Sequence, residues 1–289
     1  MHRPAAEPPF AVAPLASAVM PGRGELELTR VNGRTAVTRA MASSPLRLLT
    51  PRGRGTGARV YTSTFGGGLV AGDGIALHMR AGAGTACVLG TQASTKVYRS
   101  PAGLASSQRL TLIAEEGATC VVAPDPVTCF AGAVYEQRQE FDLHPGASLL
   151  LIDWLTSGRL ARGERWAFDH YRTRTDVAVG GRNIFRDALR LDAADGPVAA
   201  EHRMGRCDCM ALAVLVGPRM ERPAAELLDW AQAKPVTPGE DLIFSASPLL
   251  GGAVMRVAGP TTETVGRWLR ERLLFVAKLL GEDPWVRKW

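Results

Sequence analysis

Five glycines and one carboxylate lie within nine residues, from Gly66 to Gly74, and a loop of this kind can hold a phosphate group. Gly66, Gly68 and Ala71 fit the G-x-G-x-x-G/A spacing, which works by opening a helix whose N-terminal amides face the anion. The following residues, 75 to 80, instead alternate between apolar and polar side chains, which is typical of a strand. No Gly-Lys-Ser/Thr follows the glycines either. The run therefore favours a glycine turn between two strands, and nucleotide binding is the weaker alternative.

Two aspartates stand in apolar surroundings. Asp153 interrupts an apolar strand end, and Asp187 lies in a similar setting between residues 184 and 189. A carboxylate buried without a partner is costly, so each requires an ion pair or a polar cavity. For Asp153 the nearby Arg159 or Arg162 could form that ion pair. The pattern leaves both interpretations open.

The only cluster of soft ligands comprises His202, Cys207, Cys209 and Met210, and thiolates with imidazole bind nickel, copper and zinc. An apolar strand is expected from Met210 to Val216, however, and residues two apart on a strand are about 6.6 Å apart, too far to share a tetrahedral site easily. Two structural thiols are therefore favoured over a metal site. No Gly-x-Ser-x-Gly elbow and no recognisable histidine triad occur, so catalytic residues are not expected.

The segment from Thr91 to Arg99 is the densest in polar side chains. It could be a substrate loop in which Lys96 binds an anion, or a polar strand that lines a channel or an interface. The residue types alone do not decide between these two.

Three segments that share one design must position these residues. Each has an amphipathic strand, a tight glycine turn and a more apolar strand, over residues 75–89, 108–122 and 137–151. The turns repeat about every 30 residues, and one hairpin cannot bury its own face. The spacing therefore predicts a mainly β fold of stacked β-hairpins in a helical or layered arrangement. A fourth such unit is expected over residues 171–191.

About two C-terminal helices follow. Residues 221–233 and 262–280 carry apolar side chains at helical spacing, the first ending before Pro235 and the second at Gly281. Between them, residues 242–244 and 253–257 are predicted to be strands around a Gly-Gly turn.

Composition restricts the class of protein. The 289 residues are 46% hydrophobic and 21% charged, which is usual for a globular protein. The net charge of +6 comes from arginines scattered singly, without the basic run that nucleic-acid binding would require. A solvated face, or a patch for an acidic protein partner, explains this charge better.

The compartment is expected to be the cytoplasm. Five cysteines without regular spacing suit a reducing environment, and no apolar run reaches the roughly 18 residues of a membrane span. Prolines interrupt the N-terminal segment, which excludes a signal peptide there. Residues 1–20 are therefore expected to form a disordered extension, and residues 21–289 a single β-rich domain.

Several motifs occur together, in an order and spacing that carry a family resemblance. They are Gly72-Asp73 at the end of the glycine run, the segment 91–100, Phe130-Ala131-Gly132-Ala133, Asp153 to Arg159 with Gly163-Glu164, and the closing residues 284–289. Over residues 22 to 289 the chain resembles the urease accessory protein family UreD, also called UreH.

This resemblance implies a mainly β protein with a pair of helices and no catalysis of its own. Proteins of this family join UreF and the GTPase UreG on apo-urease, and help to deliver nickel to the carbamylated lysine of its active site. GTP would then belong to UreG, and this chain would hold no tightly bound cofactor and no stable metal, only Ni²⁺ in transit through a water-filled tunnel. The alternative is a β-rich enzyme or ligand-binding module that uses the loop from Gly66 to Gly74.

Single residues match the family's motifs. Asp73 ends the family's Gly-Gly-Asp, although Ala71 stands before Gly72 here, and Gly74 replaces a residue that is often polar or acidic. Thr95 precedes the family's Lys-x-Tyr-Arg-Ser. The resemblance thus implies four tunnel candidates, namely Asp73, Thr95, Asp153 and Asp187. It also implies structural roles for the motif residues Gly67, Gly68, Gly72, Lys96, Tyr98, Arg99, Gly158 and Arg159.

Spaced single carboxylates suit the passage of a hydrated Ni²⁺ ion. They attract a hard or borderline cation without holding it, whereas a thiolate cluster would bind it tightly. The aspartates are therefore better tunnel candidates than the two neighbouring cysteines.

Overall fold

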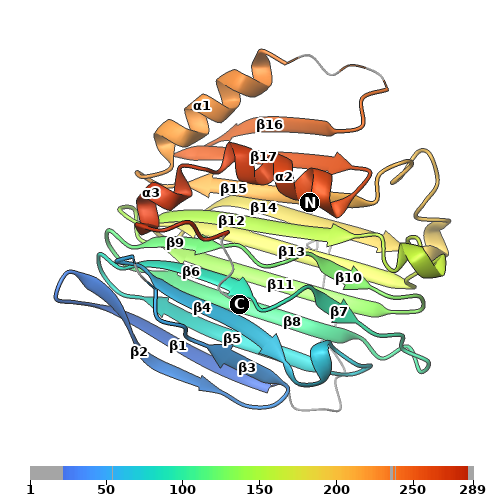
Figure 1. The fold of residues 1–289 in the computed structure, drawn as a ribbon, viewed down its shortest axis with the longest axis horizontal. Coiled ribbons are helices and arrows are strands. Elements are labelled where there is room, and N and C mark those ends of the chain that lie inside the picture. The colour runs from blue at the N-terminus through green and yellow to red at the C-terminus, as the bar shows by residue number, and fades with distance from the viewer. Residues whose placement is uncertain (1–21, 54, 235–236, 238, 286–289) are drawn as a thin grey trace, which may run out of the picture.

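A computed structural model describes residues 22–53, 55–234, 237 and 239–285, so the extension predicted over residues 1–20 lies outside the described residues. Two β-sheets face each other across a shared apolar core (Figure 1). The seven-stranded sheet contains, in spatial order, β14 (Arg182–Asp192), β13 (His170–Val179), β11 (Val134–Leu143), β8 (Ser106–Ala114), β5 (Gly74–Ala81), β1 (Gly22–Val31) and β2 (Arg34–Ala42).

The ten-stranded sheet lies closer to the helices. Its order is β16 (Ile243–Leu249), β17 (Gly252–Gly259), β15 (Cys209–Val216), β12 (Ser148–Thr156), β9 (Thr119–Val122), β6 (Ala86–Thr91), β4 (Ala58–Thr64) and β3 (Leu46–Leu49). Two short strands, β10 (Val127–Cys129) and β7 (Thr95–Val97), extend it beside β12. The predicted mainly β class and the stacked arrangement are thus confirmed.

The pairing inside the first three repeat units differs from the prediction. The two strands of each unit are not a hairpin, because they lie in opposite sheets and each pairs in parallel with its equivalent in the next unit. The second strands explain this, since β6 and β9 are buried on both faces, between the first sheet and the helices. Strands buried on both sides are typical of parallel sheets. Only the fourth unit, β13 with β14, is an antiparallel hairpin.

The connections differ between the two ends of the sandwich. At one end the chain passes between the sheets through tight turns, in which Gly84 and Gly117 have positive φ angles of 64° and 70°. At the other end the loops 92–105, 123–133 and 157–169 are longer, and two of them contain β7 and β10 (Figure 1). We call this second end the long-loop end. It holds most of the motif residues identified in the sequence.

In the part of the chain that the structure describes, three helices cover the outer face of the ten-stranded sheet: α1 (Glu221–Gln232), α2 (Thr262–Arg272) and α3 (Val276–Leu280) (Figure 1). The helix predicted over residues 262–280 is therefore wrong beyond Arg272, where a short turn separates α2 from α3. The turn redirects α3 onto β6, where Val276 and Leu280 are buried, and packing of this kind outweighs the periodicity of one long helix. Among the described residues, no helix has the length and apolar character needed to cross a membrane.

The C-terminal segment is anchored to an early strand. Arg59 on β4 is 4% exposed, and its Nε donates to Glu282 Oε1 at 2.6 Å. Its Nη2 also donates to the Asp283 carbonyl at 2.5 Å. Residues near the end of the chain thereby close over strands formed by the first third of it.

Candidate functional site

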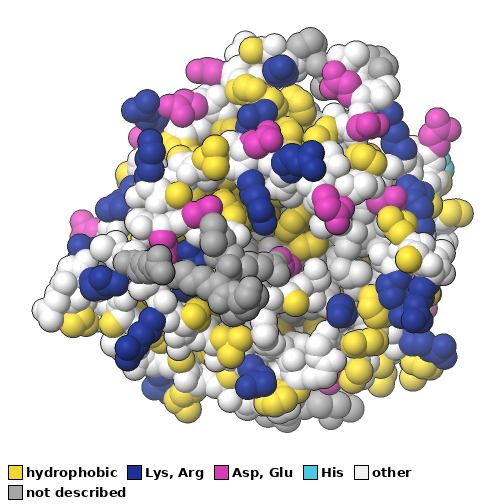
Figure 2. Space-filling view, viewed as in Figure 1, with side chains coloured by type: hydrophobic (Ala, Val, Ile, Leu, Met, Phe, Trp, Pro, Cys, Tyr) yellow, Lys and Arg dark blue, Asp and Glu magenta, His cyan; other side chains and the backbone are white. Residues whose placement is uncertain are grey.

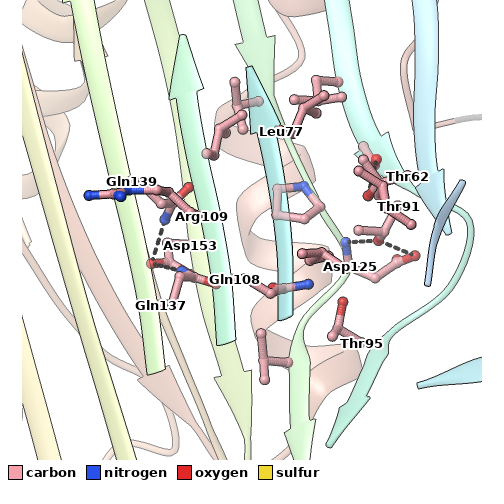
Figure 3. A pocket seen from close by; sticks show the side chains of 18 of the residues that line it. Thr62, Leu77, Thr91, Thr95, Gln108, Arg109, Asp125, Gln137, Gln139 and Asp153 are labelled. Carbon is pink, nitrogen blue, oxygen red and sulfur yellow. Dashed lines mark hydrogen bonds between the residues drawn. The ribbon is translucent and has the colours of Figure 1, made fainter. Parts of the chain in front are cut away.

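A cavity of about 80 Å³ lies between the two sheets near the long-loop end. Its volume is sufficient for water, since a water molecule occupies about 30 Å³ in the liquid. Apolar side chains such as Leu77, Leu89 and Val122 form part of the wall. The polar part of the lining consists of Thr62, Thr91, Thr95, Gln108, Arg109, Asp125, Gln137, Gln139 and Asp153 (Figure 3).

Asp153 is the carboxylate on the β12 side of this cavity. Every second side chain of β12 points into the space between the sheets, so Asp153 lies on the same inward face as Leu149 and Leu151. Its Oδ2 accepts hydrogen bonds from Gln137 Nε2 and Gln139 Nε2, each at 2.9 Å (Figure 3). Both donors are neutral amides.

The interpretation of Asp153 as half of an ion pair is wrong. Within the described part of the chain Asp153 forms no salt bridge, and Arg159 instead binds Glu164, with 2.9 Å between Nε and Oε2. The loop that follows β12 carries Arg159 to Glu164 instead, and Gly158, directly before Arg159, has a φ of 118° that favours glycine. The polar-cavity interpretation holds instead.

The surroundings of Asp153 disfavour its charged form. Burial raises its pKa to about 6, and the nearby negative charge of Asp187 acts in the same direction. The hydrogen bonds from Gln137 and Gln139 oppose this shift without cancelling it. Among the described residues, no cation forms a salt bridge that would neutralise the negative charge of Asp153.

A hydrogen-bonded network extends from Asp153 along the inward face of β11. The Tyr135 hydroxyl lies 2.5 Å from Gln108 Oε1 and 2.9 Å from Gln137 Oε1. Burial raises the pKa of Tyr135 well above its usual value, so the phenol stays neutral. Sequence reasoning missed Tyr135, Gln137 and Gln139. Their spacing at every second residue was the available signal, because it places all three on one face of a strand.

Asp187 lies on β14, at the edge of the seven-stranded sheet. Arg256 Nη2 on β17 donates to its Oδ1 at 2.7 Å, so the ion-pair interpretation holds for this aspartate. The pair joins β14, the edge strand of the seven-stranded sheet, to β17, the second strand of the ten-stranded sheet. Asp187 is not among the residues that line the cavity, although its charge influences Asp153.

The other two tunnel candidates have different positions. Thr95 lines the cavity. Asp73 does not, and its carboxylate accepts a hydrogen bond from Val70 N at 3.0 Å, while its own N–H donates to the Val70 carbonyl at 2.9 Å. Asp73 therefore stabilises the turn in which it lies. Of the four candidates, the structure brings Asp153 and Thr95 together at one cavity.

The glycine run is a strand-to-strand connection, as predicted. A short 3-10 turn, η1 (Phe65–Gly67), follows β4, and the run leads into β5 rather than into a helix. Gly67 and Gly72 have φ angles of 73° and 82°, which favour glycine. At Gly68 a Cβ atom would lie 2.6 Å from the Lys96 carbonyl oxygen. Glycine here lets the run pass close to the segment that begins at Thr95.

The remaining motif residues form a cluster at the long-loop end. The Tyr98 ring meets Phe130 edge to face, with 5.3 Å between centroids, and the Arg159 guanidinium lies 4.0 Å from the same centroid. At Gly158 a Cβ atom would lie 2.4 Å from the Glu164 carbonyl oxygen. Lys96 and Arg99 point to solvent. These contacts hold the loops together, so the structural interpretation of Tyr98, Gly158 and Arg159 has a physical basis.

All five cysteines are free and buried. Burial raises the pKa of Cys207, and it raises that of Cys209 to about 12. Both thiols therefore stay protonated, as structural cysteines do. Within the ranges that the structure describes, no group of three or more His, Cys, Asp or Glu side chains is arranged to hold a metal ion.

Comparisons with known proteins agree on one family. A family model described as UreD urease accessory protein matches residues 20–289. The chain is 52% identical over 269 residues to the urease accessory protein UreD of Sorangium cellulosum (strain So ce56), which covers 93% of this chain and 84% of that protein. It is 44% identical over 266 residues to the UreD protein of Anaeromyxobacter sp. (strain Fw109-5), covering 92% and 89%. It is also 33% identical over 290 residues to the urease accessory protein D of Oryza sativa subsp. indica, covering 91% and 94%.

Proposed function

The chain belongs to the UreD family of urease accessory proteins, and from this premise we propose that it acts as a nickel-delivery scaffold without catalysis of its own. In this proposal hydrated Ni²⁺ is the cargo, and it passes through the polar cavity between the sheets on its way to the active site of apo-urease. The residues that would guide it are Asp153 and Thr95, with Asp187 acting through its charge.

One observation carries the proposal: Asp153 presents a carboxylate to a cavity of about 80 Å³, and its hydrogen-bond donors among the described residues are neutral amides. A structural carboxylate would be expected to have an arginine or lysine partner at such a depth. A single carboxylate attracts a divalent ion but supplies too few ligands to retain it, which is what passage requires.

The family supplies the expected partners. We expect the chain to join UreF and UreG on apo-urease in the cytoplasm, with GTP bound by UreG and no cofactor held by this chain. The glycine run from Gly66 to Gly74 leads into a strand, which argues against the alternative of a nucleotide-using enzyme. Calorimetry of the chain alone with nucleotides would test that alternative.

The test is Asp153→Ala in a reconstituted activation of apo-urease with UreF, UreG, GTP and Ni²⁺. The variant should still co-purify with UreF and apo-urease, but should lower the nickel content and the activity of the urease. Asp142→Ala is the matched control, because Asp142 is an exposed carboxylate on the outer face of β11. Activation at the wild-type level by the substitutions at Asp73, Asp153 and Asp187 would show that the assignment is wrong, as would a failure of the wild-type chain to associate with these proteins.

A further inference from the structure

The arginines of the chain, which give it its net positive charge, have no part in the proposed function. They are scattered singly in the sequence, so no local segment is basic. The parallel pairing of the repeat units changes this, because in-register residues of neighbouring strands lie side by side on one face of the sheet. Arg109 on β8, Arg138 on β11 and Arg174 on β13 are in register in this way. We call these three residues the arginine row.

The arginine row lies on the outer face of the seven-stranded sheet. Gln137 and Gln139 point inward to Asp153, so Arg138 between them points outward, as do its in-register neighbours. Although Arg109 borders the cavity, its side chain is 52% exposed, and those of Arg138 and Arg174 are 37% and 30% exposed. Neighbouring strands are about 4.8 Å apart, so the row extends over about 10 Å of the surface.

Alanines rather than carboxylates lie in register with the two ends of the row. Ala76 on β5 is the neighbour of Arg109, and Ala188 on β14 is the neighbour of Arg174. Beyond Ala76, the exposed Arg23 on β1 continues the same line across the sheet. The line therefore carries positive charge over six strands.

A second row, on the long-loop side of the first, adds positive charge. Arg172 on β13 is in register with Arg190 on β14 and with Glu136 on β11. Arg190 binds Asp192, with 3.2 Å between Nη2 and Oδ2. Arg172 forms no salt bridge with any residue that the structure describes.

The carboxylates beside the arginine row are too few to neutralise it. They lie in the next row toward the tight turns, where Glu140 and Asp176 are in register. Glu140 is shared by the β8 and β11 members of the row, at 3.5 and 2.7 Å. Asp176 is shared by the β13 member and Arg186, at 2.7 and 2.5 Å. Two carboxylates thus bind four arginines, and a surplus of positive charge remains.

We infer that this part of the sheet is a docking surface for an acidic, extended segment of a partner protein. The surface, which we call the basic band, consists of the arginine row with Arg23, Arg172 and Arg190. A guanidinium binds a carboxylate through two parallel hydrogen bonds, and an extended chain presents a side chain to one face about every 6.7 Å. A segment that crosses the strands along the band therefore brings successive carboxylates within reach of successive arginines.

Two features favour a polypeptide over a nucleic acid. Single-stranded nucleic acids bind where aromatic side chains stack on the bases, but the positions beside the arginines hold residues such as Ala76 and Ser107. Outward-facing rows are about 6.7 Å apart, so the band is narrow, and Glu140 and Asp176 border it. A duplex, whose major groove alone is about 12 Å wide, would also cover these carboxylates.

The experiment measures the binding of fluorescein-labelled decaglutamate to the full chain by anisotropy, at about 0.05 M salt, where surface charges are weakly screened. The row variant carries the three substitutions Arg109→Gln, Arg138→Gln and Arg174→Gln. The matched control removes the same charge from α1 and α2 by Arg222→Gln, Arg267→Gln and Arg270→Gln. Figure 2 shows that positive and negative side chains are mixed on this helix-covered face.

The row variant should bind decaglutamate about tenfold more weakly than the wild type, because three exposed ion pairs are lost and each contributes modestly. The control should bind it no more than about twofold more weakly, since its charges are removed from a distant face. Equal weakening in the two variants, or no binding to the wild type, would overturn the inference. Thermal unfolding checks that both variants are folded.

Chemical footprinting of the wild-type chain decides if the row variant does not fold. Phenylglyoxal modifies exposed arginines, and bound decaglutamate should protect Arg172 and Arg190 while Arg222 on α1 stays reactive. Equal protection of all three would overturn the inference. Tighter binding of a ten-nucleotide oligothymidylate, with the same arginines protected, would overturn the assignment to an acidic polypeptide.

Nickel transfer takes no part in this binding, and Asp153 lies on the inner side of the sheets, outside the basic band. A failure of decaglutamate to bind would therefore leave the proposed function standing. Conversely, wild-type activation of urease by Asp153→Ala would refute the proposed function and leave the basic band unaffected.

Discussion

Replacement of Asp153 by asparagine should stabilise the folded protein at neutral pH, although it removes the carboxylate that the proposed function needs. The side chain keeps its size, and its amide oxygen can still accept the hydrogen bonds from Gln137 and Gln139. What disappears is the cost of holding a charged carboxylate in this cavity. A functional residue that destabilises its own fold is expected where binding of a cargo ion is the purpose.

The magnitude follows from the pKa of Asp153, which burial raises from 3.8 to about 6. Each pKa unit corresponds to about 1.4 kcal/mol, so the ionised carboxylate costs the folded state about 3 kcal/mol as an upper value. The sign depends on pH. Below about pH 3 both states are protonated and the cost is absent. As the pH rises through 4 to 6 the unfolded chain loses its proton first, so the free energy of unfolding falls, and above about pH 7 the cost is complete.

Urea unfolding of the wild type and Asp153→Asn, at a series of pH values from about 4.5 to 7.5, measures this difference. The variant should become more stable than the wild type as the pH rises, by about 3 kcal/mol at most. The change with pH is the diagnostic quantity, because any constant offset reflects repacking. Asp142→Asn, at the exposed position on β11, should show no such change.

A stability difference that is flat with pH would refute the reasoning. The reasoning would also be refuted if the wild type became more stable than the variant as the pH rises, because the fold would then favour the ionised carboxylate. Added Ni²⁺ provides a second arm, since a ligand that binds only the folded state stabilises it. Nickel should raise the stability of the wild type more than that of Asp153→Asn.

Three further predictions concern stability and are checked by urea unfolding at neutral pH. Gly158→Ala should lower the free energy of unfolding by about 3 kcal/mol or more, because φ at this position is 118° and the new Cβ atom would lie 2.4 Å from the Glu164 carbonyl oxygen. A loss of less than about 1 kcal/mol would contradict this geometry. Arg59→Ala should lower the free energy of unfolding by about 3 to 5 kcal/mol, because it removes the guanidinium that binds the largely buried carboxylate of Glu282. An unchanged free energy of unfolding would mean that water replaces the Arg59 guanidinium there. Gly266→Ala should gain about 1 kcal/mol from helix propensity, and a loss would show that the Trp154 ring cannot accept the methyl group.

The repeat of strands and glycine turns was predictable from the sequence, but the pairing of the strands was not. Alternating apolar residues reveal which face of β5 is buried, and the glycines at positions 84 and 117 mark the turns. Whether two successive strands pair with each other depends on the next unit, about 30 residues away, which competes for the same edge. Local patterns carry no information about that competition. The same limit applies to the end of α2, which is determined by packing on β6.

The site was predictable where a residue type conflicts with its surroundings. Asp153 stands out because a carboxylate interrupts an apolar run, and this conflict by itself requires an ion pair or a polar cavity. Its partners, Gln137 and Gln139, are ordinary residues in an amphipathic strand, since only the fold brings β11 opposite β12.

The anchoring of Glu282 on Arg59 has a consequence for how the protein is made. A ribosome synthesises β4 long before the segment around Glu282, so the partner that covers Arg59 arrives only after 223 further residues have been added. Until then the helix-facing side of β4 and β6 stays open, and an exposed apolar sheet face invites aggregation. Nascent chains should therefore depend on a bound chaperone or an early partner until the segment around Glu282 is available to cover Arg59.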